Sequence, residues 1–226
     1  MFAGHVGAGL ALGRTARRLN VGVLVLAALF LDVLLWALVY GRVEKAVVPA
    51  DFIDRHYLLF TFPWSHGLAA SLGWSALAAA VTWVATRSWA GERARASLAV
   101  AAAVLSHWFL DALVHVPELP LLGDASTKVG LGLWNHPAVA LPLEIVITLL
   151  GLVLFLSGAG LPRSRAVGLG ALVLAVVALT VAGMTVAPAP PDVRRQAVGA
   201  GVSILVVSMA AGWLGRTTSR RSTPSR

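Results

Sequence analysis

The sequence contains no cysteine. Disulfide bonds, thiolate metal ligands and cysteine nucleophiles are therefore excluded. Charged residues are also scarce, because they make up 12% of the 226 residues, whereas a soluble domain carries about 25%. A chain with so little charge does not have the composition of a water-soluble domain.

Hydrophobic residues make up 58% of the chain, and several apolar runs approach the roughly 20 residues that a spanning helix needs. The predicted fold class is all-α, a polytopic transmembrane helix bundle that forms a single domain over residues 1–214. Residues 215–226 are basic and polar, and they predict a disordered cytoplasmic tail. The six predicted spanning helices are 20–41, 64–86, 97–117, 138–158, 166–187 and 196–214.

Residues 2–13 (FAGHVGAGLALG) form a seventh apolar run that is too short to span a membrane. Its four glycines give a small-residue surface that can approach neighbouring helices closely. The run predicts a half-inserted or re-entrant helix, with an interfacial helix lying flat as the alternative. It precedes the cluster Arg14–Arg18, which is the reverse of the order in a secretory signal peptide.

The net charge is +8, and the basic residues lie in short clusters between the apolar runs. This placement follows the positive-inside rule and does not favour a nucleic-acid partner. With the N-terminus in the cytoplasm, the inner segments hold twelve basic residues and the outer segments six. The bias predicts that both termini are cytoplasmic.

Six ionisable residues lie inside the apolar runs, although each costs roughly 2.5–3.5 kcal/mol to insert at bilayer depth. Estimated at about 1.5 Å per helical residue, their depths extend from the bilayer centre through its outer half. Residues 1–158 therefore predict a polar pocket that opens outward. The six residues are His5, Asp32, His66, His107, Asp111 and Glu144.

His107 and Asp111 are four residues apart, so they share one face of a helix. Two such side chains can bind one metal ion, as His-x-x-x-His does in zinc proteases. Imidazole and carboxylate ligands suit zinc, with manganese or iron as alternatives. A catalytic site would keep one position open for a water molecule, whose pKa the metal would lower.

For each of these candidate residues, the alternative to a functional role is a purely structural one. His107 and Asp111 form a simple intrahelical pair in one alternative, and Asp32 accepts hydrogen bonds from a neighbouring helix in another. Glu144 follows Pro142, where a carboxylate near a helix start is favoured by the helix dipole. His115 and His136 lie at helix ends, where solvated roles are expected.

Four short motifs resemble those of the LexA-regulated inner-membrane family described as metal-dependent hydrolases. A weaker likeness is to zinc-dependent phospholipase C. The resemblance covers roughly residues 1–115 and implies a bacterial inner-membrane location. It also implies that His5, Asp32, His66, His107 and Asp111 bind a metal or act in catalysis. The motifs are FAGHVGAGLALG, FLDVLLW, FPWSHGL and SHWFLDALVH.

The sequence departs from this family in two motifs. The family's Pro-Asp-x-Asp appears here as Leu31-Asp32-Val33-Leu34, so the second Asp is missing. The family's His-Arg-Gly-x-Thr-His-Ser is shortened to Pro63-Trp64-Ser65-His66-Gly67, which lacks one His. The loss of two ligands argues against a two-metal site.

The leading hypothesis is a membrane protein with a metal-dependent hydrolase-like site. Its metal ligands would be His5, Asp32, His66, His107 and Asp111, and the catalytic carboxylates would be drawn from Asp32, Asp111 and Glu144. The substrate would be a lipid-accessible phosphoester or another amphiphile, and membrane lipids are the expected partners. The alternatives are a transporter or channel with an intramembrane ion or proton site, and a non-catalytic membrane scaffold.

Overall fold

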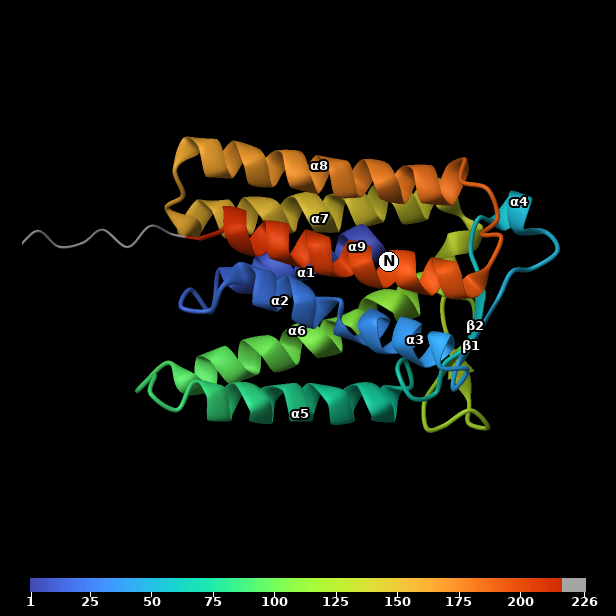
Figure 1. The fold of residues 1–226 in the computed structure, drawn as a ribbon, viewed down its shortest axis with the longest axis horizontal. Helices are drawn as coiled ribbons and strands as arrows, with labels where there is room; N and C mark the ends of the chain where they lie inside the picture. Colours follow the sequence, from blue (N-terminus) through green and yellow to red (C-terminus); the bar gives the residue numbers. More distant parts are fainter. Residues whose placement is uncertain (217–226) are drawn as a thin grey trace, which may run out of the picture.

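The computed structural model describes residues 1–216, so almost all of the predicted tail 215–226 lies outside the described residues. The described chain is a bundle of long helices with short strands at one end (Figure 1). Five helices are long and apolar enough to cross a membrane. They are α5 (Leu68–Ala85), α6 (Arg93–Val114), α7 (Pro137–Ala159), α8 (Arg163–Thr185) and α9 (Val193–Leu214).

Two further helices, α2 (Val21–Ala28) and α3 (Phe30–Tyr40), meet at Leu29 with a bend of 52° and are together long and apolar enough for a sixth, broken span. The helical bundle is therefore confirmed, and the predicted count of six spanning helices holds if this bent pair is one span. Predicted and observed ends differ by up to four residues. The region 64–67, predicted as helix, is a turn that precedes α5.

The short helix α1 (Phe2–Gly13) lies inside the bundle and packs against α7, α2 and α6. The N-terminus accordingly lies part-way along the bundle (Figure 1). A Cβ atom added to Gly7 would lie 2.6 Å from the Cα of Thr148, and one added to Gly9 would lie 2.6 Å from the Cα of Val25. Glycine therefore allows backbone contact on two sides. Of the two alternatives for residues 2–13, the inserted helix agrees with this packing.

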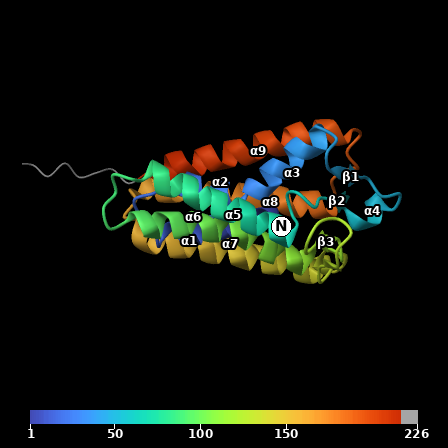
Figure 2. The same ribbon diagram turned by 90° about the horizontal axis from the view of Figure 1, so that it is seen from below.

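Short strands and turns close one end of the bundle (Figure 2). Strand β1 (Lys45–Val47) pairs antiparallel with β2 (Leu59–Thr61), and α4 (Phe52–Arg55) lies between them in the chain. Strand β3 (Leu119–Pro120) pairs antiparallel with β4 (Lys128–Val129). The 3-10 helix η1 (Leu133–Asn135) leads into α7. We call this region the strand end and the opposite one the basic end.

The core consists of apolar layers between helices, such as the cluster of Leu10, Val25, Phe155, Leu169 and Ile204. Large apolar side chains on the outer faces of α5, α7, α8 and α9 are exposed, for example Leu72, Val153 and Leu179. In a soluble monomer so much exposed apolar surface would be unusual. On a spanning helix it is the surface that faces lipid.

Packing of α1 depends on glycine at its contact points, which gives a stability prediction. Gly7→Val is expected to destabilise the fold by at least about 1–3 kcal/mol, because its side chain would overlap the α7 backbone. The matched control is Gly170→Val on α8, where a Cβ meets nothing within 4 Å. Thermal unfolding in detergent measures both. Equal effects from the two substitutions would contradict an inserted α1.

Candidate metal centre

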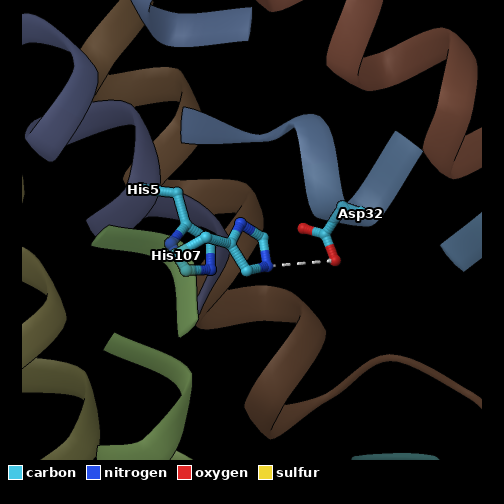
Figure 3. Close-up of side chains that lie close together, drawn as sticks. All are labelled: His5, Asp32 and His107. Atoms are coloured by element: carbon cyan, nitrogen blue, oxygen red, sulfur yellow. Dashed lines mark ion pairs between the residues drawn. The ribbon is translucent and has the colours of Figure 1, made fainter. Parts of the chain in front are cut away.

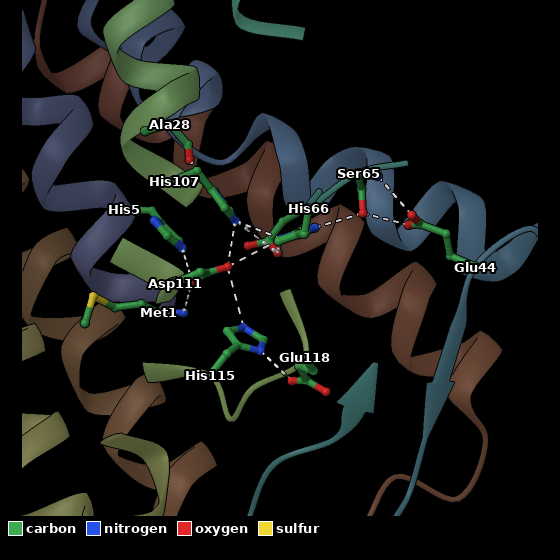
Figure 4. Close-up of polar contacts among 11 residues, drawn as sticks. Met1, His5, Ala28, Glu44, Ser65, His66, His107, Asp111, His115 and Glu118 are labelled. Atoms are coloured by element: carbon green, nitrogen blue, oxygen red, sulfur yellow. Dashed lines mark hydrogen bonds and ion pairs between the residues drawn. The ribbon is translucent and has the colours of Figure 1, made fainter. Parts of the chain in front are cut away.

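The five residues predicted as metal ligands lie close together. His5, His66 and His107 face the carboxylate of Asp111 (Figure 4), and Asp32 lies beside His66 and His107. The five residues come from α1, α3, the turn before α5 and α6. Oδ1 of Asp111 lies 3.0 Å from Nε2 of His5 and 3.1 Å from the Met1 amino nitrogen. Oδ2 faces a set of imidazole nitrogens. Its distances are 3.2 Å to His107 Nε2, 3.4 Å to His66 Nε2 and 3.5 Å to His115 Nε2.

Three of these atoms have the spacing of ligands around one metal ion. The Nε2 atoms of His66 and His107 are 3.1 Å apart, and Asp111 Oδ2 lies 3.4 Å and 3.2 Å from them. Metal–ligand bonds of about 2.0–2.1 Å separate neighbouring ligand atoms by about 3.0 Å in an octahedron and about 3.4 Å in a tetrahedron. The observed distances lie within this range.

The other ring nitrogen of each imidazole is held by a hydrogen-bond acceptor. Nδ1 of His107 donates to the Ala28 carbonyl at 2.7 Å, and Nδ1 of His115 donates to Glu118 Oε1 at 2.6 Å. Carbonyl and carboxylate oxygens only accept, so these Nδ1 atoms carry the hydrogens. In a neutral imidazole, Nε2 then bears the lone pair.

His66 is held in the same way through a serine. The Ser65 hydroxyl donates to Glu44 Oε2 at 2.7 Å, so it accepts from Nδ1 of His66 at 2.8 Å. Glu44 also accepts from the backbone amides of Trp64 and Ser65. Such outer hydrogen bonds fix the orientation of metal-binding histidines in many proteins.

The result is a buried cluster of electron pairs that face one another. Neutral His66, His107 and His115 would direct their Nε2 lone pairs at an oxygen of an ionised Asp111, whose side chain is 2% exposed. Buried acceptors without a donor are costly. A bound cation, or protons on the rings, must satisfy them.

Asp32 lies at the edge of this cluster, in the first turn of α3 just after the break at Leu29. Its Oδ1 is 3.6 Å from His66 Nε2. It is 3.7 Å from His107 Nε2, the ion pair drawn in Figure 3. With 20% of its side chain exposed, it is less buried than the other groups of the site. Access to the centre is therefore expected beside Asp32.

His5 lies behind His107, and their rings are stacked with centroids 3.7 Å apart. Its Nε2 faces Asp111 Oδ1, and its Nδ1 is buried with no hydrogen-bond partner in residues 1–216. His5, Asp32 and His107 form a second set whose ligand atoms lie within 4.8 Å of one another. The hydrogen bond with Asp111 indicates that His5 positions this carboxylate, and its direct binding of metal stays a prediction.

Glu144 is 1% exposed and lies against α1, where its Oε1 accepts from the Gly4 amide at 3.3 Å. It belongs to neither of the two sets of close ligand atoms. It is the eighth residue of α7, beyond the first turn in which the helix dipole acts. The dipole therefore does not explain its burial, and its catalytic role stays a prediction.

Sequence reasoning missed several groups of the site. His115 was expected to be solvated, but it is buried at the end of α6 and contacts Asp111 and Glu118. Its spacing of four residues from Asp111 was the available signal. Glu44 and Glu118 could not be found from residue spacing, because loops at the strand end bring them to the imidazoles only in the folded chain.

Comparison of the chain with known proteins gives no further guide. No protein-family model, no curated protein and no solved structure matches it. The function is therefore argued from the geometry of the site.

The hydrogen bond between Ser65 and His66 gives a prediction about metal affinity. Ser65→Ala is expected to weaken metal binding about 10- to 100-fold, because His66 loses the acceptor that orients it. Ser71→Ala is the matched control, since Ser71 is equally buried but its hydroxyl has no partner in the described chain. Competition with a metal-sensitive dye measures the two affinities. An unchanged affinity in Ser65→Ala would show that His66 is not a ligand.

Proposed function

We propose that this multi-pass membrane protein binds one divalent metal ion at Asp111 and uses it to hydrolyse a lipid-accessible ester. The observation that carries the proposal is the direction of the imidazole nitrogens. His66, His107 and His115 each have Nδ1 held by an acceptor, and each directs Nε2 at Asp111 Oδ2. Neutral rings in this arrangement fit a cation at the centre.

The donor set favours zinc, with manganese or iron as alternatives. Imidazole nitrogen and carboxylate oxygen are common zinc ligands, and a catalytic zinc site usually has three protein ligands and one open position. His66, His107 and Asp111 form the closest such set. The ion would polarise a water molecule or a substrate oxygen.

Within this proposal the two aspartates have different roles. Asp111 is enclosed by nitrogen atoms, so it would serve as a ligand. Asp32 lies farther from the imidazoles and is partly exposed, so it would accept a proton from an attacking water as general base. Glu144 is the less favoured candidate because its carboxylate contacts the α1 backbone.

The surroundings of Asp32 support an amphiphilic substrate. It lies on α3, whose sequence FLDVLLWALVY is otherwise apolar. A molecule that reaches the centre beside Asp32 would need an apolar part against this helix and a reactive ester at the metal. A phosphoester lipid has this chemistry.

The proposed location is the bacterial inner membrane, as the family resemblance suggests. The charge bias favours a bundle whose first loop and C-terminal end face the cytoplasm, with α1 extending into the membrane from that side so that Met1 lies within the bundle. The loops that join α1 to α2, α5 to α6 and α7 to α8 lie at the basic end (Figure 1). These loops and the first turns of α6 and α8 carry Arg14, Arg17, Arg18, Arg93, Arg95, Arg163 and Arg165. The positive-inside rule then assigns the basic end to the cytoplasm.

A second candidate is ion or proton transport, which the broken span favours. Discontinuous helices at the binding site are typical of secondary transporters, and acidic residues inside the membrane often mark ion or proton pathways. The break at Leu29 beside Asp32 has this form. In that case Asp32 and His107 would carry an ion or proton across the membrane.

Metal content tests the first step of the proposal. The purified protein is expected to retain about one zinc, manganese or iron ion per chain, and His107→Gln and Asp111→Asn are expected to lose it because they remove ligands. His136→Gln, an exposed histidine outside the site, is the control. A chelator should lower Tm in the wild type and in His136→Gln, but not in the two ligand variants. Absence of metal from well-folded protein, with no gain of Tm on adding zinc, would contradict the proposal.

Asp32→Asn separates catalysis from metal binding. This variant should keep its metal but hydrolyse a fluorogenic phosphodiester amphiphile in mixed micelles about 10²- to 10⁴-fold more slowly, because it loses the general base. Asp124→Asn, on an exposed loop, should be unaffected. Proton or metal flux into liposomes that disappears in Asp32→Asn, without any hydrolysis by the wild type, would favour transport instead.

A further inference from the structure

The basic end of the bundle contains two adjoining hollows that are separate from the metal centre. Their volumes are about 420 Å³ and about 500 Å³, and both are lined by Arg14, Arg17, Arg18 and Leu19. These residues connect the end of α1 to the start of α2. The hollows therefore lie where helices emerge from the apolar part of the bundle.

The first hollow carries an excess of positive charge. Arg95 of α6 joins the three arginines, and Glu92 is the acidic residue of the lining. Within residues 1–216 none of these four guanidinium groups forms an ion pair with a carboxylate at 4.0 Å or less. The first turn of α6 also borders the hollow, and the amino end of a helix attracts anions.

The second hollow adds an apolar wall. Val21 of α2 and Phe155 and Ala159 of α7 line it beside the arginines. A Cβ atom on Gly158 would overlap the side chain of Arg14. The glycine thus gives Arg14 room to lie across α7. Guanidinium groups next to an apolar wall suit a molecule with an anionic head and an apolar body.

We propose that these hollows bind the headgroup of an anionic phospholipid, such as phosphatidylglycerol. The arginines would bind the phosphate with paired hydrogen bonds, and the wall of the second hollow would contact the glycerol and upper acyl chains. The two hollows lie at the helix ends, which is the level of the lipid headgroups in a bilayer. Charge bias alone accounts for arginines at this end, but it does not call for guanidinium groups without a carboxylate partner around a hollow.

Lipid-dependent thermal stability tests the proposal. Purified protein in neutral detergent is titrated with phosphatidylglycerol, phosphatidylcholine or inorganic phosphate. Phosphatidylglycerol is expected to raise Tm, and the other two to have little effect. In Arg17→Gln/Arg18→Gln the apparent Kd for phosphatidylglycerol should be about thirtyfold weaker, and in Arg95→Gln about fivefold weaker, because each arginine near the membrane surface contributes about fivefold.

The control variant Lys45→Gln/Arg195→Gln removes the same charge at the strand end and should bind phosphatidylglycerol like the wild type. Equal shifts from phosphatidylcholine, or from inorganic phosphate, would overturn the assignment to an anionic lipid. Equal weakening in the control would show that overall charge, and not the hollows, attracts the lipid. Because Arg17, Arg18 and Arg95 are exposed, their substitution is expected to leave the fold intact.

Discussion

Asp111 divides its two carboxylate oxygens between two parts of the protein. Oδ1 faces His5 on α1, and Oδ2 faces His66, His107 and His115. A buried carboxylate is costly unless it is paired and hydrogen-bonded. Helix α1, the turn before α5 and the end of α6 each bring imidazole nitrogens to this carboxylate and so supply its partners. The architecture at the centre of the bundle is therefore organised by the burial of one charge.

Two irregular features of the backbone make this arrangement possible. The glycines of α1 let the helix enter the bundle far enough for His5 to reach Asp111. The break at Leu29 presents the Ala28 carbonyl to His107 and starts a new helix, so that Asp32 lies at the edge of the site. A continuous helix over residues 21–40 would engage its carbonyls within the helix. Both features depart from a regular bundle of continuous helices, and both bring polar groups to the centre.

Much of the bundle was predictable because hydropathy is a local property. The spanning helices follow from run length, and the shared face of His107 and Asp111 follows from a spacing of four residues. The bend at Leu29 has no local signal, since Ala-Ala-Leu-Phe is an ordinary helical sequence. Glu44, Ser65 and Glu118 support the imidazoles through loop contacts. Such contacts depend on how distant segments pack, which one sequence does not encode locally.

The geometry also bears on the number of metal ions. The two sets of close ligand atoms are His66, His107, Asp111 and His5, Asp32, His107, so both contain His107. Nδ1 of His107 is engaged by the Ala28 carbonyl, which leaves only Nε2 as a ligand atom. One nitrogen lone pair binds one ion, so an ion at this centre would occupy one set or the other, and not both at once. The resemblance noted in the sequence leads to the same expectation, because the motifs of this chain lack one Asp and one His of the resembled pattern.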